Sequence, residues 1–385
     1  MLRALFAALF LASSPIGWSA ALASSPGSWP VPGHDAAGTG FNAAEHILSP
    51  ANAGRLRRVW SVPAVIQAVA TASRVYALTR GGTAASLLFL DARTGQILHS
   101  FTTRALGLPG GDDVESIGYG HGKLVVGATR TIVALDAQSG RPLWRAAGGA
   151  TSLTIQGAAI YTGKGCQSYC GIQASYALDL ASGRVLWRHN GNFGGPPALV
   201  AGRLYQVWGE VGEETRVYDP ATGQLVARLP FGAGWTGDSS SAFAESSGGS
   251  GSAARLQRIS ATGRPAWTVR LGAIAGGTSP PVYAYRTLYT VSNRFHPGVI
   301  AVAAATGQIK WGADLGPSLI LAGANHLLFA LHRRTGTIDV LNAGSGALVV
   351  RLGVPGVGPP GQALLIANGT LYVIGGNGLT ALRAS

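Results

Sequence analysis

The 385-residue sequence predicts an all-β fold, an eight-bladed β-propeller made of four-stranded antiparallel blades. Three observations predict it: a short turn recurs along the chain, apolar strand-like runs flank each turn, and a tryptophan recurs at a fixed place after it. The turn has the form Thr/Ser-Gly and recurs seven times, at intervals of 39 to 45 residues. A period in this range is typical of repeat folds. The turns are Thr94-Gly95, Ser139-Gly140, Ser182-Gly183, Thr222-Gly223, Thr262-Gly263, Thr306-Gly307 and Ser345-Gly346.

Each period contains three to four short runs that predict strands. In the second period these runs are 124–128, 131–137 and 142–146, which are rich in Val, Ile and Leu and are bounded by turn residues. Four-stranded antiparallel units repeated around an axis form a propeller. Residues 239–252 consist mostly of Ser, Gly and Ala, and we expect an irregular loop there.

A tryptophan follows the turn glycine by four residues in four of the periods. A large aromatic side chain at a fixed point of an outer strand can fill the wedge between neighbouring blades. His99, Ala227 and Val350 stand at this place in the other three periods. The tryptophans that we expect to dock blades, including one before the first period, are Trp60, Trp144, Trp187, Trp267 and Trp311.

The two ends of the chain predict how the ring closes. Residues 56–62 have the pattern of an outer strand with no repeat before it, and Trp60 stands at the docking position. After the seventh turn, runs 363–366, 371–375 and 379–384 supply three further strands without an eighth turn. Pairing the N-terminal strand with these three would complete an eighth blade and remove both open edges.

The first 23 residues have the features of a signal peptide. Arg3 gives the positive start, residues 4–12 are apolar, and Ala21-Leu22-Ala23 is a small-residue cleavage site. No later window is apolar over about 18 residues, so we expect no transmembrane segment. The predicted organisation is a signal peptide (1–23), a lead segment (24–55) and one propeller domain (56–385). We expect cleavage near Ala23 and a secreted or periplasmic monomer.

The chain is basic but carries few charges. It has 29 Lys+Arg against 16 Asp+Glu, a net charge of +13, while charged residues make up only 12%. An anionic partner would explain the excess, and so would a simple scarcity of acidic residues. The arginines are scattered and no nucleic-acid-binding motif occurs, so we expect no nucleic-acid partner.

Cys166 and Cys170 are the two cysteines of the chain. In an exported protein such a pair predicts a disulfide, and a redox pair or a metal site is the alternative. The spacing is not that of a CxxC motif, and the eight histidines show no HxH or HxxxH metal spacing. We therefore expect a structural disulfide and no metal site, and the absence of a GxSxG motif leaves a serine hydrolase unsupported.

The repeat resembles that of the quinoprotein-type (pyrroloquinoline-quinone-like) propellers, A-x-D-x-x-T/S-G-x-x-x-W, and the resemblance covers roughly residues 28–384. The segment before the first blade is similar to the lead segment of secreted members of this family. The residues that carry this second resemblance are Trp29, Pro30, Gly33, Asp35, Gly40, Asn42, Glu45, Leu48, Ser49, Pro50, Asn52, Leu56 and Trp60.

In the enzymes of that family a quinone and a Ca²⁺ lie on the axis, held by carboxylate, Asn, Arg and Trp side chains. The cofactor carries the redox chemistry, and Ca²⁺ takes six to eight or so oxygen ligands. By this resemblance the candidates for binding the cofactor are Glu115, with Gln67 and Asn192 as its possible companions. The vicinal cysteine pair of the enzymes is absent and the chain is shorter, so we predict no catalytic residue and no cofactor.

These observations favour an exported, non-catalytic scaffold that presents one rim of loops to an unknown envelope protein or polymer. The alternative is a small quinoprotein oxidoreductase that uses pyrroloquinoline quinone and calcium. The rim is predicted to comprise 106–115, the loop of the two cysteines, 190–197 and 209–214, because loops on a rigid scaffold commonly carry binding.

Overall fold

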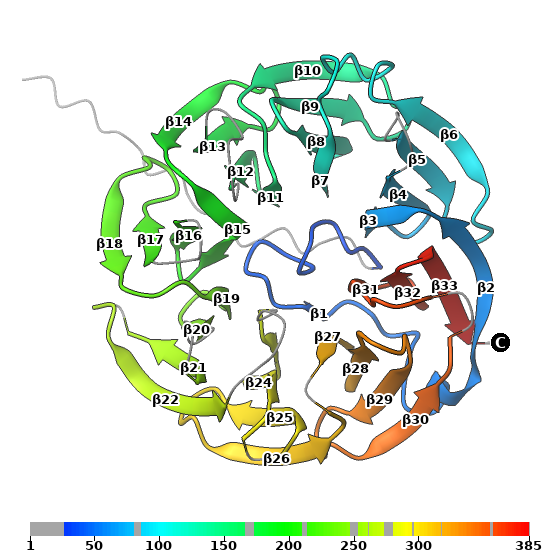
Figure 1. Cartoon of the computed structure of the whole chain (residues 1–385), viewed down its shortest axis with the longest axis vertical. Helices are drawn as coiled ribbons and strands as arrows, with labels where there is room; N and C mark the ends of the chain where they lie inside the picture. Colours follow the sequence, from blue (N-terminus) through cyan, green and yellow to red (C-terminus); the bar gives the residue numbers. More distant parts are fainter. Residues whose placement is uncertain are drawn as a thin grey trace, which may run out of the picture.

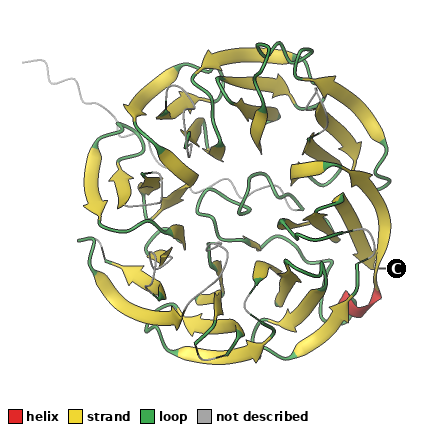
Figure 2. Cartoon of the chain, viewed as in Figure 1, coloured by secondary structure: helices red, strands yellow, loops and turns green. Residues whose placement is uncertain are grey.

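The computed structural model describes residues 27–80, 86–165, 173–209, 214–246, 253–260, 262–272, 280–294, 296–316, 318–354 and 357–384. Eight sheets are arranged in a ring around a central axis, each with its strands running from the axis outward (Figure 1). The described chain is strands and connecting loops apart from one 3-10 turn, η1 (Ala53–Arg55) (Figure 2). The predicted eight-bladed all-β propeller is confirmed.

Seven blades are formed by consecutive strands, which follow one another from the axis outward. Blade 1 consists of β3 (Val65–Ala70), β4 (Arg74–Thr79), β5 (Ser86–Asp91) and β6 (Ile97–Thr102), and blade 2 of β7 (Val114–Gly120), β8 (Lys123–Ala128), β9 (Thr131–Asp136) and β10 (Pro142–Ala147). Blade 3 consists of β11 (Ser152–Gln156), β12 (Ala159–Gly163), β13 (Ala174–Asp179) and β14 (Val185–Asn190), and blade 4 of β15 (Phe193–Val200), β16 (Arg203–Trp208), β17 (Glu214–Tyr218) and β18 (Leu225–Leu229). Blade 5 consists of β19 (Gly234–Gly237), β20 (Ala242–Ser246), β21 (Ala254–Ile259) and β22 (Pro265–Gly272). Blade 6 consists of β23 (Val282–Ala284), β24 (Thr287–Ser292), β25 (Gly298–Ala303) and β26 (Ile309–Asp314), and blade 7 of β27 (Leu319–Ala324), β28 (Leu327–His332), β29 (Ile338–Asn342) and β30 (Leu348–Leu352).

The eighth blade is assembled from both ends of the chain. Its three inner strands are β31 (Ala363–Ala367), β32 (Thr370–Gly375) and β33 (Gly378–Ala384), and its outer strand is β2 (Leu56–Pro63). β2 pairs with β33 in antiparallel register, from Leu56 opposite Ala384 to Pro63 opposite Gly378. The predicted closure of the ring is therefore confirmed, and it explains why seven turns accompany eight blades.

A turn glycine and a tryptophan meet at each of five blade junctions. Gly95 has a φ of +72°, which favours glycine, and a Cβ atom built on it would lie 2.6 Å from the Trp60 ring. The Trp60 Nε1 donates to the carbonyl oxygen of Ala92 at 3.2 Å, so the indole both covers the turn and bonds to it. The equivalent bonds of 2.9–3.1 Å run from Trp144 to Leu180, Trp187 to Pro220, Trp267 to Ala304 and Trp311 to Ala343.

Two junctions without a tryptophan use a residue two places further along the outer strand. Phe101 covers Gly140 and Leu229 covers Gly263, although His99 and Ala227 occupy the sequence position of the tryptophan. Residues two apart in a strand point to the same side of the sheet, so a side chain of the right size at either place can fill the wedge.

Blade 5 corrects one expectation from the sequence. Part of the Ser/Gly/Ala-rich run is a strand, β20, and every residue of Ala242–Ser246 is buried; residues 247–252 lie outside the described residues. The small side chains of Ala242, Ala244 and Ser246 lie on one side of this strand, and those of Phe243 and Glu245 lie on the other. β20 also carries Glu245, whose Oε2 accepts a hydrogen bond from the Thr290 hydroxyl of β24 in blade 6.

Replacing Gly95 with alanine tests the packing of the turn against the tryptophan. Both Gly95→Ala and the control Gly122→Ala place a side chain at a φ near +70°, which costs about 1–2 kcal/mol. The Gly122 site is open within 4 Å, whereas the new methyl group at position 95 collides with Trp60. We expect Gly95→Ala to lower the free energy of unfolding by about 1–3 kcal/mol more than the control, measured by urea denaturation. Equal losses would contradict the packing role.

Glu245 predicts how stability depends on pH. Burial raises the pKa of its carboxyl to about 8, and the bond from Thr290 lowers it only in part. Between about pH 4.5 and pH 8 the folded chain keeps this proton while the unfolded chain releases it, so stability falls as the pH rises. Thermal unfolding of Glu245→Gln from pH 5 to 9 should show a flatter pH dependence and a gain over the wild type above pH 8. Parallel curves would refute this assignment.

Candidate functional site

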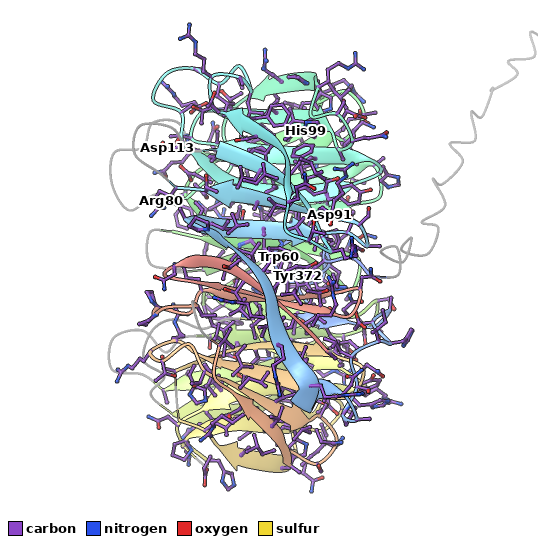
Figure 3. All side chains as sticks on the ribbon, turned by 90° about the vertical axis from the view of Figure 1, so that its right-hand side faces the viewer. Trp60, Arg80, Asp91, His99, Asp113 and Tyr372 are labelled. Carbon is purple, nitrogen blue, oxygen red and sulfur yellow. The ribbon has the colours of Figure 1, made fainter. Side chains whose placement is uncertain are left out.

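The ring has two faces, which the side view separates (Figure 3). Asp91 marks the turn face, where the turns between the first and second and between the third and fourth strands lie. Arg80 and Asp113 mark the loop face, which carries the connections between blades and between the second and third strands. The rim predicted from the sequence is part of the loop face, over blades 2 to 4.

The loop between β6 and β7 is held by two arginines of blade 2. Arg145 donates from Nε and Nη2 to the Leu106 carbonyl oxygen at 3.3 and 3.1 Å, and the Leu106 side chain is buried. Arg130 donates from its backbone N–H to Asp112 Oδ1 at 2.7 Å and from Nη2 to the Gly110 carbonyl oxygen at 2.7 Å. This loop is therefore built in advance of any binding event.

Glu115, the main candidate from the sequence, is half-buried on β7 beside this loop. The Thr129 hydroxyl donates to its Oε1 at 3.0 Å. Burial raises the pKa of Glu115, and the Thr129 bond and the charge of Lys164 oppose that rise in part. Glu115 therefore lies between Thr129 of blade 2, to which it is bonded, and Lys164 of blade 3.

The other two candidates lie on different blades. Gln67 is half-buried on β3, and its Oε1 has no hydrogen-bond partner among the described residues. Asn192 precedes β15, its carbonyl oxygen accepts the N–H of Gly209 at 3.0 Å, and a Cβ on Gly165 would lie 3.1 Å from its Oδ1. Residue 192 is thus in contact with both residue 165 and residue 209. Cys166 and Cys170, the predicted disulfide, lie outside the described residues.

The residues of this face do not fit a quinone held by calcium. A Ca²⁺ site needs six or so oxygen ligands, usually with carboxylates among them. Within the described ranges no group of three or more His, Cys, Asp or Glu side chains could hold a metal ion. Asp112 Oδ1 accepts from Arg130, while its buried Oδ2 has no hydrogen-bond partner among the described residues. Glu115 already accepts from the Thr129 hydroxyl and neighbours the positive charge of Lys164.

The turn face has a feature that sequence reasoning missed: the lead segment crosses the axis of the ring (Figure 1). Its short strand β1 (Phe41–Asn42) pairs in parallel with β27 of blade 7. Further backbone hydrogen bonds of 2.7–3.0 Å join it to innermost strands around the ring: Trp29 with Ala70, Pro30 with Tyr119, Ala36 with Leu199, Thr39 with Tyr283 and Gly40 with Gly323. One segment thereby contacts blades 1, 2, 4, 6 and 7.

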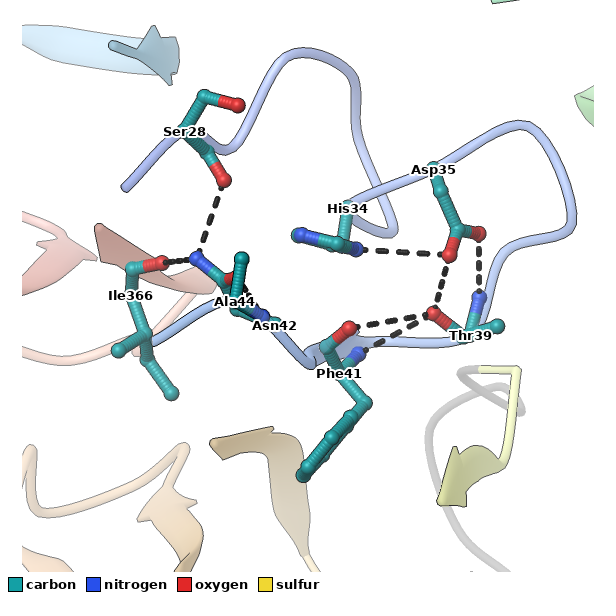
Figure 4. Close-up of polar contacts among 8 residues, drawn as sticks. All are labelled: Ser28, His34, Asp35, Thr39, Phe41, Asn42, Ala44 and Ile366. Atoms are coloured by element: carbon teal, nitrogen blue, oxygen red, sulfur yellow. Dashed lines mark hydrogen bonds and ion pairs between the residues drawn. The ribbon is translucent and has the colours of Figure 1, made fainter. Parts of the chain in front are cut away.

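Short-range hydrogen bonds hold the lead segment in shape (Figure 4). Asp35 accepts from the Thr39 backbone N–H at 3.0 Å and from its hydroxyl at 2.6 Å. Asn42 donates from Nδ2 to the carbonyl oxygens of Ser28 at 3.1 Å and Ile366 at 2.8 Å. Asp35 and Asn42 belong to the residues by which the lead segment resembles secreted members of the quinoprotein-type family. Their Gly-x-Asp and Gly-x-Asn patterns were the signal in the sequence for an ordered segment here.

Comparisons with known proteins agree with this architecture. Residues 85–248 match the family model described as "Outer membrane protein assembly factor BamB". No curated protein sequence matches the chain. The predicted resemblance to the quinoprotein-type propeller repeat is confirmed by the family match together with the structural matches that follow.

Three solved structures illustrate the likeness. BamB from Moraxella catarrhalis is 18% identical with a TM-score of 0.63, over 85% of this chain and 99% of that one. The quinohemoprotein alcohol dehydrogenase from Comamonas testosteroni is 14% identical with a TM-score of 0.69, over 94% and 81%. A europium-containing methanol dehydrogenase is 12% identical with a TM-score of 0.64, over 91% and 90%. At such identities the likeness shows the fold, which scaffolds and enzymes share.

Proposed function

We propose that this chain is an exported, non-catalytic binding protein of the cell envelope or the surrounding medium, whose loop face docks a partner protein. The observation that carries the proposal is the arginine-held loop 103–113. A loop whose backbone is fixed before binding loses little conformational entropy on docking, which is how a rigid surface gains affinity. The partner is an envelope component, and the chain acts as a monomer.

The description of the matching family supports this proposal. The family model is named for an outer-membrane protein assembly factor, and one similar structure is the BamB of Moraxella catarrhalis. The predicted signal peptide at residues 1–23 supports export. No helix within the described residues is long and apolar enough to cross a membrane.

The charges of the loop face indicate the chemistry of the partner. Arg80, Arg104 and Arg130 are exposed around the fixed loop, and Asp113 is the exposed acidic residue beside them. Charge complementarity steers docking and selects partners. The partner should therefore present an acidic segment to blades 1 and 2.

Replacing one exposed arginine on each face tests where the partner docks. Arg104 belongs to the fixed loop of the loop face, and Arg93 lies on the turn face, two residues after Asp91. Both arginines are exposed. We expect Arg104→Glu to reduce partner capture from envelope extract at least about tenfold, because a like charge opposite an acidic surface costs about 1.4 kcal/mol or more. Arg93→Glu serves as the matched control and should capture as the wild type does. Equal capture by both variants would refute the proposed surface.

The alternative, a quinoprotein oxidoreductase, is separated by adding its cofactor. Purified protein is titrated with pyrroloquinoline quinone and Ca²⁺ while absorbance, thermal unfolding and dye-linked alcohol oxidation are recorded. The donor set of the described loop face predicts no saturable binding and no turnover. Saturable binding accompanied by turnover would overturn the non-catalytic assignment.

A further inference from the structure

The lead segment forms one wall of a cavity on the turn face, on the side opposite the proposed docking loops. The cavity has a volume of about 750 Å³, which lies in the range of small-molecule sites. Its walls include Phe41 of the lead segment and Tyr119, Ile155, Tyr283 and Tyr285 of the blades. A rigid, largely apolar and aromatic hollow with a few polar groups is the usual form of a ligand site.

Two carboxylates and two histidines, His34 and His121, line this cavity. Asp35 and Asp238 line it, and no lysine or arginine does so among the described residues, although the chain as a whole carries a net charge of +13. The Asp35 side chain is 36% exposed. Arg258 approaches from outside the lining, where its Nη2 donates to Ser241 Oγ at 3.3 Å. The cavity is therefore a negatively charged hollow in a positively charged molecule.

Both carboxylates are held ionised. Burial raises the pKa of Asp35, but the hydrogen bonds from His34 and Thr39 and the charge of His34 outweigh it, so the pKa lies below its usual value. The pKa of Asp238 is likewise lowered, because the bonds from Tyr283, Ser240 and Ser241 outweigh burial.

A chain of hydrogen bonds fixes the two carboxylates relative to each other. Asp35 accepts from Thr39, and the Thr39 carbonyl oxygen accepts the backbone N–H of Tyr283 at 2.8 Å. The Tyr283 hydroxyl then donates to Asp238 Oδ2 at 2.6 Å. Burial, together with the bond to Asp238, raises the pKa of Tyr283 to about 12, so the tyrosine remains a donor at neutral pH.

Tyr285 stands at the cavity wall in a costly conformation. It has a φ of +50° and Arg286, next to it in the same turn, a φ of +56°. The corresponding turns of blades 2, 4, 7 and 8 also have a positive φ at both positions, and His121, Ala201, Asn325 and Asn368 stand at the place of Tyr285, but each of these turns includes a glycine or an asparagine. The turn of blade 6 has neither residue, so its left-handed backbone is strained, and such strain concentrates at functional sites.

The neighbours of Tyr285 keep it in place although it is 52% exposed. Its ring stacks on His326 with centroids 4.8 Å apart and meets the edge of Phe41 at 5.2 Å. An aromatic face held rigidly at the mouth of a negatively charged hollow attracts cations through the negative potential of the ring.

We propose that this cavity binds a small aliphatic diammonium ion, with one ammonium group near each of Asp35 and Asp238 and the methylene chain against the aromatic walls. The carboxylates supply charge neutralisation, the tyrosines supply cation–π attraction, and the apolar walls take the methylene groups out of water. With two carboxylates and no lysine or arginine among the described lining residues, the same electrostatics disfavour anions.

Calorimetric titration of the full mature chain at pH 7.5 and low salt tests this proposal. The probe is 1,4-diaminobutane, compared with 1-aminobutane, neutral 1,4-butanediol and dianionic succinate. We expect saturable binding of the diamine, at least about tenfold weaker binding of the monoamine, and none of the diol or succinate. Equal binding of the diol or the succinate, or no diamine binding at millimolar concentration, would overturn the proposal.

Three variants locate the binding. Asp238→Asn keeps an oxygen that can accept from Ser240 and Ser241 but loses the charge, and we expect at least about tenfold weaker diamine binding. Tyr285→Ala removes an exposed side chain without opening the core, so a several-fold loss is expected even if Asp238→Asn is poorly folded. Asp314→Asn, at a carboxylate 69% exposed outside the cavity, is the control and should bind as the wild type does. Unchanged affinity in both cavity variants would contradict the assignment.

Discussion

The antiparallel pairing of β2 with β33 is the interaction on which the rest of the molecule depends. Without it, β33 would be the open edge of a three-stranded sheet and the ring would end between blades 8 and 1. With it, the Trp60 indole reaches the turn at Gly95 in blade 1 and donates to Ala92 there. One strand thereby joins the two ends of the chain and completes the series of blade junctions.

The closed ring in turn creates both surfaces to which we assign binding. On the loop face it holds neighbouring blade edges in register, so that Arg130 and Arg145 of blade 2 can fix the loop that leaves blade 1. On the turn face it leaves an axial opening that the lead segment crosses, and the cavity lies between this segment and the blades. The two proposed binding surfaces differ in charge, since exposed arginines surround the fixed loop whereas two aspartates line the cavity.

The fold could be predicted from the sequence because every blade needs the same turn, strand pattern and docking side chain. The turn glycine, the strand runs and the tryptophan recur, and the count of strands at the two ends was enough to predict the eighth blade. The sequence alone could not predict contacts between residues that are distant along the chain. Phe101 replaces His99 at a junction, and β20 forms inside the Ser/Gly/Ala-rich run as a strand whose residues are all buried. Asp35 and Asp238 are 203 positions apart and share a cavity only because the lead segment crosses the ring.

Amide hydrogen exchange of the C-terminal strand in the intact chain tests the central claim most directly. Since β33 is hydrogen-bonded to β32 on one side and to β2 on the other, its amides should exchange as slowly as those of an internal third strand such as β9. Exchange of residues 378–384 at the rate of an outer strand such as β6 or β10 would show an unpaired edge. That result would contradict closure of the ring by the N-terminal strand.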